Sequence, residues 1–406
     1  MNNIYTPKQL SLLRLWQRGQ LKRINILSGS VRSGKTWISL VLWAFWVGTM
    51  PEDGNYLMTA KTLTSLRRNC LDLLQVLIGQ KNFQYNLSRK EARLFGRLVY
   101  LEGCNDARAE SKIRGMTLQG AYCDELTQFT EDFFAMLLSR LSDSGAKLLA
   151  TTNPDSQRHW LMRQYLDRKN DIDLLLLEFL IDDNTFLDAE YVAQLKREYR
   201  GVFFERFILG RWVVAEGLVY PAQAQGEGII PADPERRYTR YFVSVDYGTV
   251  NPFSAGLWGH SKGVWYRIRE IYWDSRQKGR QRTDYEHYNA LVEFIGGLPV
   301  EAIIVDPSAA SFMECIRRAG RYIARPADND VLNGIRATAA AFATGHIKVH
   351  DCCVNSIAEF GVYRWNESAP VDSVLKENDH AMDDIRYFVN TVVRKDGRSG
   401  VVTIQG

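Results

Sequence analysis

The sequence lacks a long, uninterrupted apolar run. A transmembrane helix needs about 20 apolar residues in succession, and no segment of this chain approaches about 18. The first ten residues, MNNIYTPKQL, also lack the apolar core of a secretory signal. We therefore expect no membrane span and a cytoplasmic location.

Cysteine is scarce, and its spacing follows no metal-binding or redox pattern. The six cysteines form no CxxC pair and no metal-finger spacing, so they predict neither a zinc site nor a disulfide framework. The adjacent Cys352 and Cys353 are interpreted as packing residues, with a redox role as the alternative. The net charge of +4 is too small to indicate a nucleic-acid partner and only permits one.

The chain is long enough for two domains, because each half of 406 residues could bury its own core. Strand-like and helical runs alternate up to about residue 211, and the segment 62–79 has leucines at helical spacing. This alternation is typical of a mostly parallel sheet with helices on both faces. The strand-like runs are 24–29, 55–60, 97–103, 118–125 and 147–154.

A change of composition separates this pattern from a second one. Residues 215–238 are rich in Gly, Pro and Ala and show little periodicity, which predicts a linker. A second α/β pattern begins at RYFVSVDYG and continues to the end of the chain. No internal repeat or low-complexity tract is visible.

A glycine-rich loop lies between a strand-like run and a helical run near the N-terminus. In a loop of this type, backbone N–H groups surround phosphate oxygens, a lysine neutralises their charge and a threonine hydroxyl binds Mg²⁺. The residues that satisfy the pattern G-x-x-x-x-G-K-[ST] are Gly29, Gly34, Lys35 and Thr36. The predicted nucleotide site also includes the intervening residues Ser30, Val31, Arg32 and Ser33.

An acidic pair ends another apolar strand, AYCDE. A P-loop enzyme needs one carboxylate for Mg²⁺ and another for the attacking water, and Asp124 and Glu125 supply them. The adjacent glutamate favours a hydrolysing ATPase over a simple nucleotide kinase. A later strand closes with TTNP, which places Asn153 to sense the γ-phosphate. The alternatives are a helix cap for the acidic pair and a strand-ending turn for TTNP.

Phosphoryl transfer also calls for a cation over the γ-phosphate. Arg32, inside the loop, could act within its own subunit, and Arg114, in SKIRGMTLQG, could act on a neighbouring subunit. The alternative for both is a solvated surface arginine. Gln9, upstream of the loop in YTPKQ, is an amide of the kind that reads adenine, and its alternative is an exposed glutamine at a helix start.

Acidic residues also end two apolar strands in the second half of the chain. Asp246 follows YFVSV and Asp306 follows EAIIV, and burying such carboxylates is costly unless something binds them. In HAMDDIRY, His380 and Asp383 share a helix face, while Asp384 is turned away by about 100°. Together these residues predict an RNase H-like metal site. The residues alone leave the choice between Asp383 and Asp384 open.

A basic loop lies between the first two acidic strands. In DSRQKGRQRTDYEHYN the basic residues alternate with others, so the loop could straddle a DNA phosphate backbone. A solvated charged loop is the alternative. The basic residues are Arg276, Lys278, Arg280 and Arg282.

Taken in order, these motifs resemble the large terminase subunit of tailed bacteriophages, particularly the PBSX-like family. The resemblance covers nearly the whole chain, from TPKQ to HAMDDIRY. It implies Lys35 and Thr36 for ATP and Mg²⁺, Asp124 for the metal, Glu125 for catalysis, Asn153 for coupling and Arg114 as a finger acting in trans. In the nuclease it implies metal ligands at Asp246, Asp306, His380 and Asp383, although the doublet Asp383-Asp384 departs from the family pattern.

The resemblance also implies an architecture and partners. We expect an α/β chain with an ASCE-type P-loop ATPase domain at 1–214, carrying a helical lid near 170–214, and an RNase H-like endonuclease domain at 239–406. Such a protein cuts concatemeric viral DNA and moves duplex DNA into a procapsid with ATP, Mg²⁺ and two nuclease cations, Mg²⁺ or Mn²⁺. Its implied partners are double-stranded DNA, the portal protein, the small terminase subunit and copies of itself in a ring, a pentamer.

The implied location is the host cytoplasm and transiently the portal vertex, outside the mature virion. Two rival functions remain. One is a P-loop DNA helicase or remodeller whose second half is a non-catalytic RNase H-like binding module. The other is a transposition or integration factor, because transposases share the RNase H-like fold.

Overall fold

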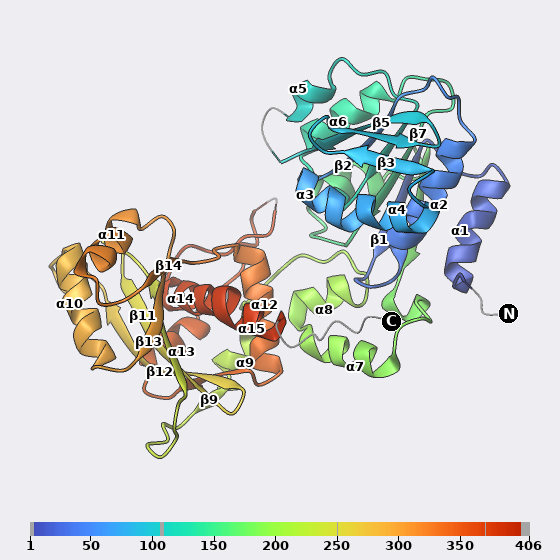
Figure 1. Cartoon of the computed structure of the whole chain (residues 1–406). Coiled ribbons are helices and arrows are strands. Elements are labelled where there is room, and N and C mark those ends of the chain that lie inside the picture. Colours follow the sequence, from blue (N-terminus) through green and yellow to red (C-terminus); the bar gives the residue numbers. More distant parts are fainter. Residues whose placement is uncertain (1–3, 106–108, 250, 370, 399–406) are drawn as a thin grey trace. The chain divides into compact units, whose positions relative to one another are not determined.

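Two compact units divide the chain in the computed structural model (Figure 1). The structure describes residues 4–105, 109–249, 251–369 and 371–398, so residues 399–406 of the predicted second domain lie outside the described residues. The first unit comprises residues 1–196 and 201–214, and the second comprises residues 197–200 and 215–406. Within the described ranges no helix is long and apolar enough to span a membrane.

An eight-stranded sheet with the order β3-β4-β5-β2-β6-β7-β1-β8 forms the centre of the first unit. The strands from β5 to β8 in this order are parallel neighbours, and β3 and β4 add an antiparallel hairpin beside β5. The five predicted strands are confirmed, whereas β3, β4 and β8 were not predicted. The strands are β1 (Ile24–Gly29), β2 (Tyr56–Ala60), β3 (Phe83–Asn86), β4 (Glu91–Leu94), β5 (Arg97–Gly103), β6 (Gly120–Cys123), β7 (Lys147–Thr152) and β8 (Leu174–Phe179).

Helices cover both faces of this sheet (Figure 1). Parallel strands with both faces covered read as continuous apolar runs, and β1 and β2 are buried along their whole length. The helices up to residue 140 are α1 (Pro7–Gln17), α2 (Lys35–Gly48), α3 (Leu63–Leu66), α4 (Asp72–Ile78), α5 (Ala109–Ile113) and α6 (Glu131–Arg140), and after β8 come α7 (Ala189–Glu198) and α8 (Gly201–Phe207). Short π or 3₁₀ turns are η1 (Arg67–Leu71), η2 (Leu126–Gln128), η3 (Met162–Leu166) and η4 (Ile181–Asp183).

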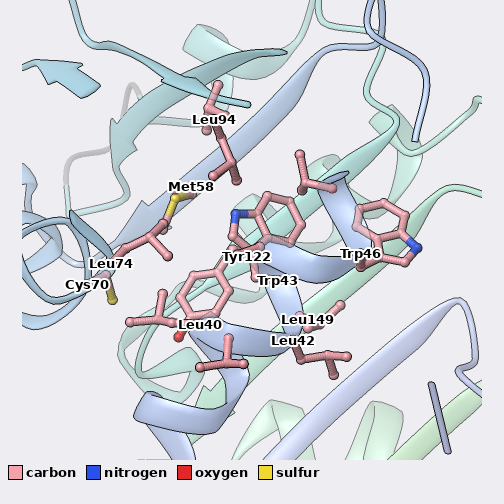
Figure 2. Close-up of a cluster of buried hydrophobic side chains, with 14 of the residues drawn as sticks. Leu40, Leu42, Trp43, Trp46, Met58, Cys70, Leu74, Leu94, Tyr122 and Leu149 are labelled. Atoms are coloured by element: carbon pink, nitrogen blue, oxygen red, sulfur yellow. The ribbon is translucent and has the colours of Figure 1, made fainter. Parts of the chain in front are cut away.

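The helix α2 is apolar nearly all round because it lies inside the core. Figure 2 shows Trp43 and Trp46 of this helix among the leucines and Tyr122 of the core. A Cβ atom on Gly120, at the start of β6, would lie only 2.4 Å from the Trp46 ring, so the strand and helix approach where a side chain is missing. The helix that follows the phosphate loop is therefore packed closely against β6.

The segment predicted as a helical lid, near 170–214, begins with a strand. Residues Leu174–Phe179 form β8, which pairs in parallel with β1 at the edge of the sheet. The run LLLLEF lacks helix-capping residues and finds its hydrogen-bond partner in the chain's own first strand. The helices α7 and α8 follow it.

A seven-stranded sheet with the order β14-β13-β10-β11-β12-β15-β9 forms the second unit. The strands β10, β11 and β12 make an antiparallel meander, and the remaining neighbours pair in parallel. The strands are β9 (Ile229–Ile230), β10 (Arg240–Asp246), β11 (Phe253–Ser261), β12 (Val264–Trp273), β13 (Val300–Val305), β14 (Ala324–Pro326) and β15 (Ile347–His350).

Helices also flank the second sheet on both sides (Figure 1). The pair α10 and α11 packs against β10, β11 and β13, whereas Phe388 of α14 stacks on Trp258 of β11 at a ring distance of 4.1 Å. The helices are α9 (Pro221–Ala224), α10 (Asp284–Ile295), α11 (Ala310–Ala319), α12 (Val331–Ala343), α13 (Val354–Phe360), α14 (His380–Phe388) and α15 (Arg394–Arg398), with the π turn η5 (Val389–Val393).

Much of the predicted linker, 215–238, is folded into the second unit. Tyr220 is buried among the rings of Phe342, Phe360 and Tyr363, and α9 follows it directly. The strand β9 then pairs with β15. The segment shows no helical or strand periodicity in its sequence because its helix α9 has four residues and its strand β9 has two.

Candidate active sites

The phosphate loop connects β1 to α2 in the first unit. At Gly29 the backbone φ is 149°, and a Cβ atom there would lie 1.8 Å from the Phe179 carbonyl oxygen. The N–H groups of Ser30 and Val31 donate to the carbonyls of Phe179 and Phe207, each over 2.9 Å. These two N–H groups are therefore engaged with protein carbonyls, although both residues were predicted to contact the nucleotide.

A cavity of about 300 Å³ lies at the N-terminus of α2. It is lined by residues 32–37 together with Asn184 and Leu187. The buried Ser33 hydroxyl, which belongs to this lining, has no hydrogen-bond partner in the described part of the chain. A helix N-terminus with an unpaired buried hydroxyl and a lysine suits an anionic ligand such as a nucleotide phosphate.

Lys35 is the first residue of α2 and is buried. Its Nζ donates to the Ser30 carbonyl over 2.9 Å and to Asn153 Oδ1 over 2.7 Å. Burial lowers the pKa of Lys35 to about 8, against the opposing effect of Asp124 and Glu125. Asn153, predicted to sense the γ-phosphate, thus contacts the lysine of the loop directly.

The acidic pair follows β6, the second strand from β1 in the sheet order. The buried Asp124 carboxylate accepts hydrogen bonds from Thr151 Oγ1 over 2.8 Å and from Asn69 Nδ2 over 3.0 Å. Glu125 adopts a left-handed backbone with φ of 56°, which is uncommon for a residue other than glycine. Although Glu125 is exposed, desolvation of its carboxyl group and the adjacent Asp124 raise its pKa.

The two candidate arginines occupy different surroundings. Arg32 lines the cavity, and its carbonyl accepts a hydrogen bond from Asn184 Nδ2 over 2.8 Å. Arg114 is exposed and forms an ion pair of 2.7 Å with Glu110, one helical turn earlier. It is not part of the cavity lining.

Gln9 is buried and lies against the phosphate loop. Its Oε1 accepts from the Thr6 N–H over 3.0 Å, which completes the capping box of α1. Its Nε2 lies 3.5 Å from the Gly34 carbonyl oxygen. The structure therefore brings Gln9 to the loop, while its side-chain oxygen serves the helix start.

The motifs in the sequence did not identify four residues near the nucleotide site, namely Trp37, Asn69, Asn184 and Leu187. Trp37 could have been found, since it directly follows the P-loop pattern. Asn184 and Asn69 carry no local signal, because each reaches the site through the fold.

A second cavity, of about 350 Å³, lies in the second unit and collects the predicted nuclease residues. Asp246, Asp306, His380 and Asp383 all line it. His380 Nδ1 lies 2.8 Å from Asp246 Oδ2, and the Tyr387 hydroxyl donates to Asp306 Oδ2 over 2.7 Å. Burial raises the pKa of Asp246 to about 6, although the hydrogen bond from His380 opposes this shift.

The two consecutive aspartates of α14 face different surroundings. Asp383 lines the cavity and is paired with Arg386 over 2.8 Å and with Lys376 over 3.2 Å. Asp384 has no exposed surface and points into the sheet, where it accepts from Ser244 over 2.9 Å and from Arg267 Nη2 over 2.9 Å. Asp383 therefore shares the cavity with the other acids, and Asp384 does not.

The carboxylate groups that line this cavity are suitable ligands for hard divalent cations. Carboxylate oxygens are the ligands that Mg²⁺ and Mn²⁺ prefer, and two-metal nucleases use such ligands. Within the described ranges, however, no three His, Cys, Asp or Glu side chains lie close enough together to hold one ion. Instead, Arg386 and Lys376 hold the carboxylate of Asp383.

The helix α14 begins on a buried carboxylate from α13. Glu359 Oε2 accepts from the N–H groups of Ala381 and Met382 over 2.7 and 3.1 Å, and Oε1 accepts from the Tyr272 hydroxyl over 2.7 Å. Burial raises the pKa of Glu359 to about 7. This glutamate stabilises the start of the helix that carries His380 and Asp383, and nothing in its local sequence predicted this.

The basic loop between β12 and α10 is partly engaged with its own unit. Arg276 Nη2 donates to Asn251 Oδ1 over 3.3 Å, and Asn251 lines the acidic cavity. Arg280 is paired with Glu286, and Arg282 lies over the Trp273 ring at 3.6 Å. The loop therefore reaches the rim of the acidic cavity through Arg276.

Comparisons with known proteins agree on one family. The family model Terminase_3, described as phage terminase large subunit, matches residues 22–211. The terminase large subunit of Escherichia phage T5 is 26% identical over 226 residues, which cover 52% of this chain and 50% of the T5 protein. The chain thus spans about half the length of this relative.

Solved structures of the large terminase from a thermophilic bacteriophage match almost the whole chain. One is 37% identical with a TM-score of 0.90 and covers 96% of this chain and 99% of that chain. The same protein in complex with ADP is 37% identical with a TM-score of 0.88 and covers 96% of this chain and 100% of that chain. A further structure holds ATP-gamma-S, with 37% identity, a TM-score of 0.87 and coverage of 96% and 99%.

Proposed function

Because the chain belongs to the family of phage terminase large subunits, we propose that it is an ATP-driven DNA-packaging motor subunit that also cleaves concatemeric DNA. The observation that carries the ATPase part is the contact between Lys35 and Asn153 beside Asp124 and Glu125. Open parallel sheets bind ligands at the carboxyl ends of their strands, and all four residues lie there. The ADP and ATP-gamma-S complexes of the large terminase from the thermophilic bacteriophage support the same ligand class.

In the proposed ATPase cycle, Lys35 neutralises phosphate charge and the N–H groups near the start of α2 hold the phosphate oxygens. Thr36 and Asp124 would hold Mg²⁺, which supplies charge neutralisation between the phosphates when it is bound with ATP. Glu125 orients the attacking water and accepts its proton as the bond from the water oxygen to the γ-phosphorus forms and the bond from the γ-phosphorus to the β,γ-bridging oxygen breaks, which releases ADP and phosphate. Asn153 directly follows β7 and accepts a hydrogen bond from Lys35, so it couples the phosphates that Lys35 contacts to the end of this strand.

Two arginines are proposed to act on the γ-phosphate from different subunits. Arg32 lines the cavity of its own chain and can act there. Arg114 is exposed and lies outside this lining, which suits action on a neighbouring subunit in a ring. Gln9 remains a candidate for adenine recognition through Nε2, since its Oε1 is used by the Thr6 N–H.

In the second unit, the proposed nuclease uses Asp246, Asp306 and Asp383 to hold two divalent cations, with His380 as a further ligand or a support for Asp246. Bound cations of this kind activate water and stabilise the leaving oxygen of a phosphodiester. Release of Lys376 would free an oxygen of Asp383 for this task. The antiparallel meander continued by parallel strands supports an RNase H-like domain at 239–406, after an ATPase domain at 1–214 and the segment 215–238.

The proposed partners follow from the family. They are double-stranded DNA, the portal protein of the procapsid, the small terminase subunit and other copies of the chain in a ring. Such a protein would act in the host cytoplasm and transiently at the portal vertex.

One observation favours a second candidate, a DNA-translocating ATPase with a non-catalytic second unit. In the described part of the second unit the acidic side chains do not lie close enough together to hold one ion. Asp383 is instead paired with Lys376 and Arg386. Nicking of plasmid by the full chain with MnCl₂ but without ATP separates the two candidates, because a non-catalytic module would leave the plasmid intact.

Packaging in vitro tests the proposed function as a whole. Purified chain, procapsids, DNA and ATP should yield DNA protected from added nuclease. Lys35→Ala should lose ATP turnover and packaging but keep Mn²⁺-dependent nicking, since Lys35 and the acidic cavity belong to different units. Lys81→Ala, an exposed lysine of the first unit, is the matched control and should package normally. Equal loss of nicking and ATP turnover in folded Lys35→Ala protein would contradict the separation.

A further inference from the structure

Asn69 contacts the acidic pair from the helical segment that follows β2. Its Nδ2 donates to Asp124 Oδ2 over 3.0 Å, while Thr151 Oγ1 donates to Asp124 Oδ1 over 2.8 Å. In the sheet β6 lies between β2 and β7, and the two donors come from β7 itself and from the helical segment that follows β2. Each oxygen of the carboxylate therefore has a defined partner.

The orientation of the Asn69 amide is fixed by its neighbour. Arg68 Nε donates to Asn69 Oδ1 over 3.3 Å. A side-chain amide has one accepting and one donating end, so this contact directs the donating end towards Asp124. The cation of Arg68 also opposes the rise in the pKa of Glu125, which places its charge near the second acid. The chain of contacts thus runs from Arg68 through Asn69 to Asp124.

The backbone around Asn69 is unusual. Residues Arg67–Leu71 form a π turn between α3 and α4, and such turns are frequent at functional sites. The segment starts at Thr62, whose hydroxyl accepts from the Ser65 N–H over 3.0 Å in a capping box. Cys70 and Leu71 are both buried in the core, and Figure 2 shows Cys70 near Tyr122. The wide turn accommodates both in the core while Asn69 reaches the carboxyl edge of the sheet.

We infer that Asn69 is a positioning residue that orients the Asp124 carboxylate for Mg²⁺ at the nucleotide site. The inference rests on the proposed ATPase function. An ionised carboxylate has about four lone-pair sites, and Asn69 and Thr151 take two of them, so the remaining sites face a fixed direction. Partners that orient a ligand carboxylate are worth about 10- to 100-fold in metal affinity or activity.

The inference separates the response to Mg²⁺ from the binding of the phosphates themselves. Asn69 is not among the residues that line the phosphate cavity, which include Lys35 and the rest of residues 32–37. Removing the Asn69 amide should therefore weaken the effect of Mg²⁺ and leave the binding of metal-free ADP unchanged. If Asn69 only stabilised the fold, its substitution would change the Mg²⁺ response and the binding of metal-free ADP together.

The test compares Asn69→Leu, which keeps the size of the side chain and removes its donor, with the wild-type chain. ADP binding is measured by calorimetry without MgCl₂ and over a series of MgCl₂ concentrations, and ATP turnover is measured over the same series. We expect the half-saturating MgCl₂ concentration to rise by about 10- to 100-fold in both measurements. The serine in Asn69→Ser is too short to reach Asp124, but its polar side chain is compatible with a water molecule in the vacated space. This variant should show the same shift as Asn69→Leu, and it replaces Asn69→Leu if that variant does not fold.

Matched controls lie in the same segment and just after it. Asn82→Leu removes an exposed amide that donates to the Ile78 carbonyl after α4, and it should leave the Mg²⁺ response unchanged. Arg68→Ala should shift the response in the same direction as Asn69→Leu but less, whereas Arg67→Ala, which loses contacts with Asp72 and Tyr85 rather than with the acidic pair, should not shift it. A wild-type Mg²⁺ response in both Asn69 variants would overturn the inference. A wild-type chain without ATP turnover would instead contradict the proposed function.

Discussion

Arg267 donates both of its Nη nitrogens to the Asp384 carboxylate, and neither side chain has exposed surface. Ser244 and Ser254 donate to the same carboxylate. Because Ser244, Arg267 and Ser254 lie on β10, β12 and β11, one carboxylate ties α14 to three adjacent strands. Asp383, the preceding residue, lines the acidic cavity instead.

Asp384→Asn should destabilise the chain strongly. Removing one partner of a buried ion pair leaves the other charge uncompensated, which costs about 3–5 kcal/mol in the free energy of unfolding. Urea unfolding measures this cost. Asp182→Asn, which removes an exposed ion pair with Lys196, should cost at most about 1 kcal/mol. Similar costs for the two variants would show that the Arg267–Asp384 pair does not anchor α14.

Asp383→Asn should abolish Mn²⁺-dependent nicking of plasmid, and it should also lower the stability of the fold because the buried Arg386 loses its ion-pair partner. The side chain lines the cavity beside Asp246 and Asp306, and an amide oxygen binds a divalent cation more weakly than a carboxylate. Nicking is followed on gels, and melting of the same preparation controls for folding. Normal cleavage by Asp383→Asn would remove this residue from the nuclease site.

Glu125→Gln should bind ADP normally but hydrolyse ATP at least ~100-fold more slowly, as expected for the loss of a general base. The amide keeps the size of the side chain and its place after β6 but cannot accept a proton. Phosphate release measures the rate. Glu52→Gln, at an exposed position of the same unit, is the control. Normal turnover in Glu125→Gln would transfer the catalytic role to another group.

Arg114→Ala should lose ATP turnover in a ring and regain part of it when mixed with Lys35→Ala subunits. If Arg114 acts in trans, mixed interfaces can combine an intact Arg114 of one subunit with an intact Lys35 of the next. Arg32→Ala, whose side chain lines its own cavity, should not be rescued in this way. No recovery at any mixing ratio would exclude action of Arg114 between subunits.

The stability of the chain should fall between about pH 6.5 and about pH 4 because of His287. Its ring is buried and stacks on Phe253 at 4.2 Å, and burial, together with the cation of Arg282, lowers the pKa of His287 from 6.5 to about 4. In this range the unfolded chain binds a proton at this histidine and the folded chain does not, so acid favours unfolding.

His287→Phe keeps an aromatic ring against Phe253 and removes the proton acceptor. Urea unfolding at pH 7 and pH 5 should therefore show a smaller loss of stability in this variant than in the wild-type chain. His346→Phe, at an exposed position, is the control and should keep the wild-type loss. Equal losses in all three proteins would mean that His287 does not contribute to acid sensitivity.

The sequence predicted those features whose residues are close together in the chain or end an apolar strand. The phosphate loop spans eight consecutive residues. Asp124 follows β6, Asp246 ends β10 and Asp306 follows β13, so each lies at the carboxyl edge of the sheet in its own unit. The assignment of Asp383 rather than Asp384 to the cavity could not be derived locally. It depends on Arg267, more than a hundred residues away in the chain, which pairs with Asp384.

Other features were invisible for the same reason. Asn69 and Asn184 contact the ATPase site only through the fold. The strand β8 was placed in a helical lid because its apolar run finds its partner, β1, about 150 residues earlier in the chain. Tyr220 was assigned to a linker because the rings that bury it come from α12 and α13, far away in the sequence.

The backbone contacts of Ser30 and Val31 decide how the chain can be divided for study. Their N–H groups donate to carbonyls of Phe179 and Phe207, and β8 covers the side of β1 that β7 does not. A fragment that stopped at the end of β7 would leave β1 as an exposed edge strand and the phosphate loop without two of its hydrogen bonds. The smallest autonomous ATPase fragment therefore has to extend beyond Phe207, although every recognisable nucleotide motif ends by Pro154.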